Sequence, residues 1–166
     1  MKILVALGAL IVLIAGYTAY TVVRPFVLHT AIEIDASPEQ VWNVLADRDA
    51  YPEWNPFIIS STGELTAGGT ITNVLRDTEG KETSFSPELL VVEPNRELRW
   101  IGKVPPGFIF DGEHSFRLEE LPNGRTRLIH EETFRGAAIP FTKSMLNKTI
   151  KPQFIAMNEA LADRVS

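Results

Sequence analysis

Three ionisable residues in the last third of the chain could carry chemistry, and they lie in stretches where apolar and polar residues alternate. They are His114, His130 and Glu132, within the segments HSF and IHEE. A histidine beside a carboxylate can transfer protons at neutral pH, because the pKa of a free histidine is about 6.5. The same groups could instead bind the polar end of a ligand. Either role requires a fold that brings the three side chains together.

The turn between the two stretches determines which residues face each other. A two-residue loop of Asn123 and Gly124 would pair Pro122 with Arg125, at a position whose N–H must donate, and proline has no N–H. A three-residue loop suits the sequence better, because Pro122 then takes the second turn position and Gly124 the left-handed bulge. We therefore predict that Leu121 lies opposite Arg125.

This register places the three ionisable residues on one face of the predicted hairpin. His114 lies opposite Glu132, with Cβ atoms about 4.5–5.5 Å apart, and His130 lies diagonally from His114. The opposite face carries charged pairs such as Glu119 with Arg127, as expected for a sheet with one side in water. The other members of the inner face are Phe110, Phe116, Leu118 and Leu128.

Four interpretations of the cluster are open. The first is a polar pair that satisfies itself inside a core, because a buried carboxylate must be paired and hydrogen-bonded. The second is an anchor for the polar head of a ligand in a mostly apolar pocket. The third is an acid/base pair formed by His114 and Glu132. The fourth is a metal site, but no further ligand motif accompanies these residues, and we expect neither a metal nor a cofactor.

The N-terminal segment is the most apolar part of the chain. Residues 3–23 carry no charge and are flanked by Lys2 and Arg24. As a helix rising about 1.5 Å per residue, they would span the roughly 30 Å hydrocarbon core of a bilayer. We therefore predict a single-pass transmembrane anchor over residues 1–25. The alternatives are a cleaved signal peptide, which lacks a small-x-small cleavage site here, and a core helix, which would show a polar stripe.

Charge bears on orientation and on partners. The amino terminus and Lys2 exceed Arg24 by one charge, which slightly favours an extracytoplasmic domain. The chain has 16 Lys and Arg against 21 Asp and Glu, a net charge of −5. We expect no nucleic-acid partner, because such binding depends on basic groups that neutralise phosphates. The sequence has no cysteine, which excludes disulfides and a cysteine nucleophile, and it indicates no oligomeric state.

Periodicity and turn signals predict the elements that position these residues. Residues 26–34 alternate as a strand, and Ser37 with Gln40 predicts the capping box of a short helix. A final helix is predicted over 143–165, with a kink at Pro152. Between the helices, strands are predicted at 57–62, 70–77, 83–93, 96–104, 108–120 and 125–135. This order is an α+β layout.

The layout and three local signatures resemble the START-like polyketide cyclase/dehydrase superfamily, often called SRPBCC. The signatures are IDASPEQVWNVLADRDAYPEWNP at 34–56, FDGEHSFRLEELPNGRTRLIHEETFRG at 110–136 and FIAMNEALADR at 154–164. The resemblance covers residues 26–166. It implies a helix-grip fold, in which a curved antiparallel sheet wraps around the long C-terminal helix. It also implies a cavity between sheet and helix for an apolar or amphipathic molecule.

The residues expected to face this cavity combine the ionisable cluster with apolar side chains. Trp54 is expected at its rim and the others inside, although plain core packing is the alternative for the aromatic members. The predicted ligand-binding residues are Trp54, Phe57, Ile59, Leu98, Trp100, Phe110, His114, Phe116, His130, Glu132, Phe154 and Met157.

Three functions compete. The first is a membrane-tethered domain that binds a lipid-like or polyketide-like small molecule in an enclosed cavity, with His114 and Glu132 at one end. The second is a cyclase/dehydrase-type enzyme, in which His114 and Glu132 are the acid/base pair. The third is an accessory domain that binds a protein partner. Members of one fold family differ in function, so the resemblance alone does not choose among them.

Overall fold

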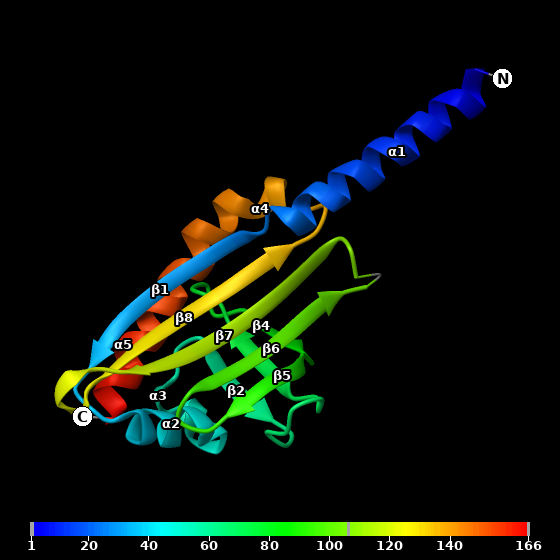
Figure 1. Ribbon diagram of the computed structural model, residues 1–166. Coiled ribbons are helices and arrows are strands. Elements are labelled where there is room, and N and C mark those ends of the chain that lie inside the picture. Colours follow the sequence, from blue (N-terminus) through cyan, green and yellow to red (C-terminus); the bar gives the residue numbers. More distant parts are fainter. Residues whose placement is uncertain (1, 106, 166) are drawn as a thin grey trace.

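A long N-terminal helix projects from a domain made of two antiparallel sheets and several helices (Figure 1). The computed structural model describes residues 2–105 and 107–165. Helix α1 (Lys2–Val23) has the predicted position, and none of the residues in its apolar 18-residue window is buried. The alternative of a core helix, which the sequence disfavours, does not fit this exposure. By length and composition, α1 can cross a membrane.

The larger sheet has five antiparallel strands in the order β1-β8-β7-β6-β5. Helix α5 (Lys151–Val165) lies on its inner side, together with the short helix α2 (Pro38–Ala46). This arrangement confirms the α+β helix-grip fold. The strands are β1 (Phe26–Ile34), β5 (Glu88–Glu93), β6 (Glu97–Val104), β7 (Phe110–Glu120) and β8 (Thr126–Arg135).

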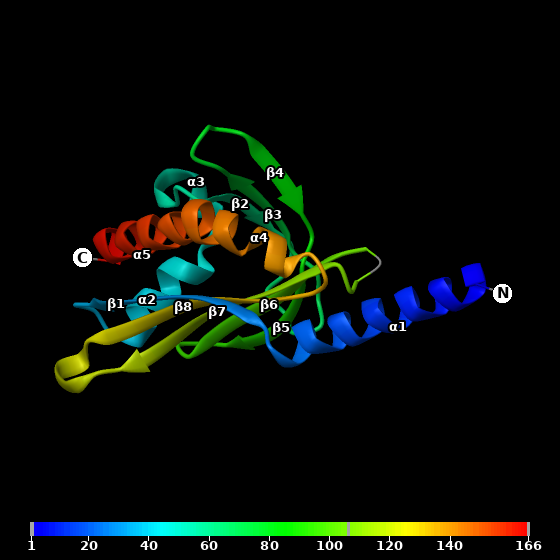
Figure 2. The same ribbon diagram turned by 90° about the horizontal axis from the view of Figure 1, so that it is seen from above.

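A smaller sheet packs on the same side of the large sheet as α5 (Figure 2). Its order is β2-β3-β4, with the strands β2 (Ile58–Thr62), β3 (Thr72–Arg76) and β4 (Glu82–Phe85). The one-turn helices η1 (Arg48–Ala50) and α3 (Tyr51–Trp54) precede β2. The domain therefore has two sheets that face each other, and residues of both sheets line a pocket between them.

The strand predicted over 83–93 is wrong in one respect, because it is two strands in two different sheets. The break falls between Phe85 and Glu88, at Pro87. A proline cannot donate to a ladder, and here the Pro87 carbonyl instead accepts from the Ile71 N–H at 3.1 Å. The chain crosses from the small sheet to the large one at this point.

The C-terminal helix begins earlier than predicted and is irregular in its middle. It comprises α4 (Ile139–Met145), a π-helical turn η3 (Leu146–Ile150) and α5. Pro152 lies two residues after the π turn, whose residues include Lys148, the position with whose carbonyl the proline ring would clash in a regular helix. The predicted irregularity at Pro152 thus takes the form of a π turn. Leu146, Phe154, Met157 and Leu161 form the buried stripe of this helix.

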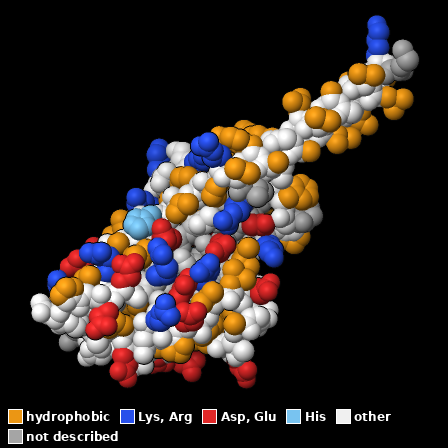
Figure 3. Space-filling model, viewed as in Figure 1, with side chains coloured by type: hydrophobic (Ala, Val, Ile, Leu, Met, Phe, Trp, Pro, Cys, Tyr) orange, Lys and Arg blue, Asp and Glu red, His pale blue; other side chains and the backbone are white. Residues whose placement is uncertain are grey.

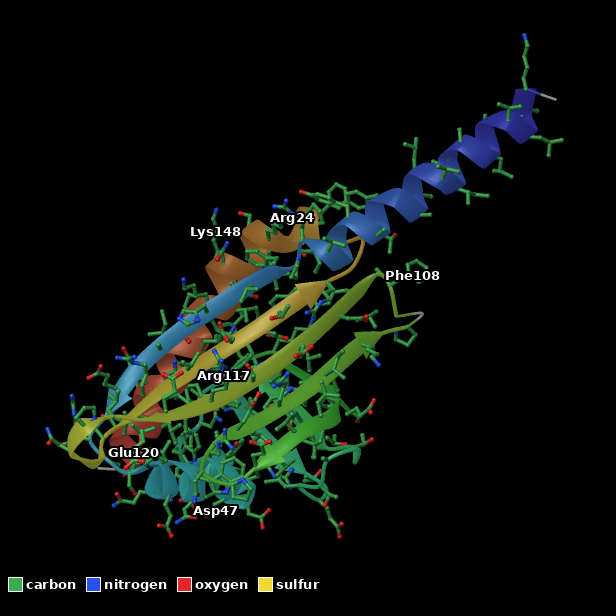
Figure 4. All side chains as sticks on the ribbon, viewed as in Figure 1. Arg24, Asp47, Phe108, Arg117, Glu120 and Lys148 are labelled. Atoms are coloured by element: carbon green, nitrogen blue, oxygen red, sulfur yellow. The ribbon has the colours of Figure 1, made fainter. Side chains whose placement is uncertain are left out.

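The β7–β8 hairpin has the predicted register. The Leu121 N–H donates to the Arg125 carbonyl at 2.7 Å, and Gly124 takes a φ of +74°. Asn123 is also left-handed, with a φ of 70°. The outer face of the large sheet carries interspersed basic and acidic side chains, among them Arg117, which binds Glu131 at 3.0 Å (Figures 3 and 4).

Candidate functional site

The ionisable cluster forms on the inner face of the β7–β8 hairpin. Ladder pairing puts His114 opposite Glu132 and Phe116 opposite His130, as the turn predicted. His114 is 4% exposed and His130 is fully buried, whereas the Glu132 side chain is 18% exposed. Glu132 is therefore the member of the cluster that reaches toward solvent.

A continuous series of polar contacts runs from Glu132 into the core. The Oε2 atom of Glu132 lies 3.6 Å from Nδ1 of His114, and the Nε2 atoms of His114 and His130 are 2.8 Å apart. On the far side, Nδ1 of His130 is 2.8 Å from Oδ1 of Asn158, which comes from α5. The Nδ2 group of Asn158 donates to Thr30 Oγ1 of β1 at 3.0 Å. The polar chain thus links three strands and the terminal helix.

Aromatic rings enclose both imidazoles. His114 stacks on Trp100 with ring centroids 4.6 Å apart, and His130 stacks on Phe154 at 3.9 Å. Burial disfavours the charged imidazolium, so it lowers the pKa of His114 to about 3. Burial also lowers the pKa of His130, and the neighbouring His114 adds to the effect. Both histidines are neutral at physiological pH.

Burial shifts the pKa of Glu132 in the opposite direction. It raises the pKa of this carboxyl from 4.5 to about 8, because a carboxylate is the charged form of the group. The site therefore combines neutral imidazoles with a carboxyl group that holds its proton at neutral pH. A perturbed carboxyl of this kind is a common feature of functional sites.

Two glycines leave a gap beside Glu132 on the inner face of the large sheet. Gly102 of β6 pairs directly with Gly112 of β7, so two adjacent inward positions carry no side chain. A Cβ atom added at Gly112 would lie 2.5 Å from Oε1 of Glu132, which shows that the carboxyl occupies the space above this glycine. At Gly102, an added Cβ would meet the Phe85 ring at 3.6 Å.

The gap is the floor of an open pocket of about 250 Å³, hereafter the glycine pocket. Its walls are mainly apolar and come from both sheets, and Glu132 supplies its inward polar group. The lining residues are Leu75, Thr83, Phe85, Trp100, Gly102, Lys103, Val104, Phe110, Gly112 and Glu132. A mainly apolar pocket with a few polar groups is typical of sites for small molecules.

The position of this pocket differs from the sequence-based expectation. The cavity was expected between the large sheet and the C-terminal helix, but there the His130 ring packs directly on Phe154. The glycine pocket lies instead between the two sheets, and no residue of α5 lines it. It is also open, whereas the sequence predicted an enclosed cavity.

The predicted ligand-binding residues therefore separate into groups. Three of them, Trp100, Phe110 and Glu132, line the glycine pocket, and His114 lies directly behind Glu132. Phe57 lines a second open depression of about 370 Å³ beside α5. The residues that are instead fully enclosed in the core are Leu98, Phe116, His130, Phe154 and Met157.

Neither Ile59 nor Trp54 lines the glycine pocket, and their role in ligand binding stays a prediction. The pairing of β2 with β3 shifts between Ile58 and Ser60, and Ile58 is 1% exposed while Ile59 is half-buried. Trp54 was expected at the cavity rim, but it ends helix α3 and packs edge-on against Tyr51 at 5.2 Å. The bulge and the short helix are local features that alternation does not predict.

Sequence reasoning missed three residues. Gly102 and Gly112 form the pocket floor, and a glycine inside a strand is a recognised sign of close approach by a ligand. Asn73, on the same face of β3 as Leu75, is 1% exposed, and neither its Oδ1 nor its Nδ2 has a partner among the described residues. No pattern in the sequence distinguishes Asn73 from a surface strand residue.

Comparisons with known proteins agree with this fold. Residues 25–166 match the family described as polyketide cyclase / dehydrase and lipid transport. The fold is similar to that of the Zhui aromatase/cyclase from Streptomyces sp. R1128, with a TM-score of 0.68 and 18% identity over 85% of this chain and 93% of that one. A START superfamily protein from Mycobacterium smegmatis gives 0.63 and 20%, over 84% and 96%. No curated protein sequence matches the chain.

Proposed function

Because the chain belongs to the polyketide cyclase/dehydrase and lipid transport family, we propose that residues 26–166 bind an apolar or amphipathic small molecule in the glycine pocket. The observation that carries this proposal is the pocket itself. Two paired glycines open the inner face of the large sheet beside the half-buried carboxyl group of Glu132. Glycine weakens a long strand, and inside a strand it often marks a place where a ligand or another group approaches closely.

The pocket dimensions restrict the ligand. Its volume of about 250 Å³ is slightly below the range of roughly 300–1,000 Å³ for sites that enclose drug-sized molecules. Because the pocket is open, a longer molecule could place one end against Glu132 and extend outward between the sheets. The walls, with Trp100, Phe85 and Phe110, favour a flat or chain-like apolar group at that end.

We further propose that α1 anchors this domain in a membrane. Exposed apolar residues gather where α1 joins the domain. Phe108, in the β6–β7 loop, lies at the same end of the domain (Figure 4). The Ala137 and Ala138 N–H groups donate to the carbonyls of Phe108 and Ile109 at 3.0 Å, which holds this loop beside the start of α4. A poorly soluble ligand would concentrate in the bilayer next to the pocket.

A second function, a cyclase/dehydrase-type enzyme, is favoured by one observation. His114 Nδ1 lies 3.6 Å from Glu132 Oε2, close enough for a proton to move between them after a small adjustment. Glu132 would contact the reacting molecule, and His114 would exchange the proton from behind. In this case a His114→Ala variant should lose turnover and keep ligand affinity. If His114 only helped to hold the ligand, the same variant would lose affinity as well.

Mass spectrometry of the full-length protein, purified in mild detergent, tests the binding proposal. We expect a small apolar molecule to copurify with the wild type and to be lost from Gly102→Leu, whose side chain would fill the pocket. The matched control is Glu120→Gln at the opposite end of the domain (Figure 4). Equal amounts of ligand in Gly102→Leu and the wild type would contradict the proposal.

A further inference from the structure

The basic side chains of the domain differ in whether they have acidic partners. On the outer face of the large sheet they lie in ion pairs, such as Arg99 with Glu113 at 3.2 Å. In the segment that runs from α4 into α5, no basic side chain has an ion pair among the residues that the structure describes. These side chains are Lys143, Lys148 and Lys151, of which Lys143 and Lys148 are exposed. The exposed lysines are therefore available to an anionic partner.

Charge is distributed unevenly along the chain. The sequence has 21 Asp and Glu against 16 Lys and Arg, yet residues 136–158 contain the three lysines and no acidic residue. Lys148 and Arg24 lie at the end of the domain from which α1 projects (Figure 4). Toward the same end, Asp111 pairs with Lys103 in the ladder, so these two charges offset each other. An acidic domain thus has a basic end beside its N-terminal helix, and such an end attracts anionic groups such as lipid phosphates.

Helix α4 also exposes apolar side chains. Phe141 is 84% exposed and Met145 is 48% exposed. They are four residues apart, so they lie on the same side of the helix, whereas Ile139 and Leu146 are buried against the domain. Exposure of a phenylalanine to water is unfavourable. A helix that presents large apolar side chains together with lysines is typical of segments that lie in a membrane interface.

The β6–β7 loop extends this surface. Phe108 is 49% exposed and Ile109 is 38% exposed. Their carbonyls accept hydrogen bonds from the Ala137 and Ala138 N–H groups at 3.0 Å, so the loop and the start of α4 are held together. The combined surface is hereafter the α4 face. Its members are Phe108, Ile109, Phe141, Lys143, Met145 and Lys148.

The connection from α1 to β1 limits how far the α4 face can lie from a membrane that α1 crosses. Helix α1 ends at Val23 and β1 begins at Phe26, and three residues span at most about 11 Å. Lys143 Nζ lies 5.6 Å from the centroid of the Phe26 ring. The headgroup layer on one side of a bilayer extends roughly 5–8 Å beyond the hydrocarbon core. If α1 crosses the bilayer, the headgroups therefore reach α4.

We propose that the α4 face docks on the bilayer that α1 crosses, with its apolar side chains among the acyl chains and its lysines on the phosphates of anionic lipids. This inference rests on the proposed anchor and adds the orientation of the domain. Val104 and Phe110, which flank the β6–β7 loop, line the glycine pocket. Docking therefore brings this end of the pocket to the membrane, and an apolar ligand can pass from the bilayer into the pocket without first dissolving in water.

Electron paramagnetic resonance of the full-length protein in lipid nanodiscs tests the docking. The discs contain phosphatidylcholine mixed with anionic phosphatidylglycerol. The chain has no cysteine, so Ser144→Cys carries a single spin label at an exposed position of α4, and Glu120→Cys carries a control label at the opposite end of the domain (Figure 4). We expect oxygen, which dissolves in acyl chains, to relax the α4 label more strongly than a water-soluble nickel chelate does. The control label should show the reverse order.

Lysine variants test the contact with lipid phosphates. With the label on α4, Lys143→Gln and Lys148→Gln should each lower the ratio of docked to undocked protein about fivefold, the effect of one basic residue near an anionic surface. The matched control is Lys81→Gln, an exposed lysine in the turn between β3 and β4, which should leave the ratio unchanged. In discs of phosphatidylcholine alone, the lysine variants should equal the wild type.

The outcomes separate this inference from the anchor. A chain that does not enter the discs overturns the anchor and the docking together. A chain that enters the discs, with an α4 label as accessible to nickel as the control label, overturns the docking and leaves the anchor intact. A label shielded from both reagents shows that a protein partner or a second copy of the chain covers the α4 face, which also overturns the docking. Lysine variants that dock as the wild type does in anionic discs overturn the contact with phosphates.

Discussion

Glu131 and Glu132 are consecutive residues with opposite surroundings. Glu131 lies on the outer face, where its carboxylate binds His29 at 2.8 Å and Arg117 at 3.0 Å. Glu132 points inward and faces Nδ1 of a neutral histidine. Strand alternation alone produces this difference. It places Glu131 in surface ion pairs, and it places Glu132 where burial raises the pKa of its carboxyl group. The pair supplies a matched comparison for every experiment on the site.

Glu132 should make the folded protein less stable as the pH rises. Its pKa increases from 4.5 to about 8 on folding, so between these values the unfolded chain releases a proton that the folded chain retains. The free energy of unfolding then falls with pH, by at most about 1.4 kcal/mol per unit. His114 acts in the opposite sense between pH 3 and 6.5, where only the unfolded chain binds its proton.

Between pH 4.5 and 6.5 the effects of Glu132 and His114 cancel. His130, whose pKa burial also lowers, adds a rise up to pH 6.5, so stability should be greatest near pH 6.5 as far as these three groups determine it. We expect Glu132→Gln to remove the decline between pH 6.5 and 8, and Glu131→Gln to preserve it. Thermal unfolding followed by circular dichroism at each pH measures this profile. A decline of equal slope in Glu132→Gln would show that Glu132 is ionised in the folded protein.

The residues of the polar chain differ in how far the sequence could predict them. The pairing of His114 with Glu132 followed from Pro122 and Gly124, because the turn alone determines the register. Asn158 could not be found in this way, since it reaches His130 across 28 positions of sequence through the packing of α5 on the sheet. Helix periodicity gives the buried stripe of α5 but not the angle at which it crosses the strands.

At the scale of elements, β6 and β7 act together as the floor of the site. Gly102 and Gly112 are direct neighbours, yet they differ in what an added methyl group would meet. At Gly112 the methyl carbon would be 2.5 Å from the Glu132 carboxyl, which must then move. At Gly102 it would reach the Phe85 ring at 3.6 Å, an ordinary contact distance.

Gly112→Ala should therefore displace the Glu132 carboxyl, while Gly102→Ala should only make the pocket smaller. We expect Gly112→Ala to shift the titration of the Glu132 carboxyl, measured by NMR with glutamate labelled with ¹³C at the carboxyl carbon. Gly102→Ala should leave that titration unchanged and be as stable as wild type. Identical titration curves in both variants would mean that the carboxyl does not occupy the space above Gly112.

The predicted elements were correct where local signals decide them. The capping box of α2 is present, with Ser37 N donating to Gln40 Oε1 at 2.9 Å and Gln40 N to Ser37 Oγ at 3.3 Å. The boundary between β4 and β5 was missed, although Pro87 marked it, because alternating residues continue on both sides. Which sheet a strand joins depends on long-range packing. The sequence therefore did not predict the separate small sheet or the wall of the pocket that β3 and β4 form.

At the scale of the whole molecule, apolar and charged surfaces are segregated. The exposed side chains of α1 are almost entirely hydrophobic, whereas the outer face of the large sheet mixes both charges (Figure 3). Phe141 on α4 is 84% exposed, and Phe108 is exposed in the β6–β7 loop. Lys143 lies over the Phe26 ring, with Nζ 5.6 Å from its centroid, which places α4 beside the start of β1. The exposed aromatic residues therefore surround the point where α1 leaves the domain.

Removal of residues 1–24 should release the protein from membranes without unfolding the domain. The apolar window of α1 has no buried residue, so its loss should leave the thermal midpoint of the domain unchanged. The full chain should resist carbonate extraction, and the truncated one should appear in the soluble fraction. Burial of a phenylalanine contributes about 1.5–3 kcal/mol, so Phe141 should give the truncated domain weak residual binding to neutral vesicles, which Phe141→Asp removes. A full-length protein found in the soluble fraction would contradict the anchor, and an unfolded truncated domain would show that α1 is part of the core.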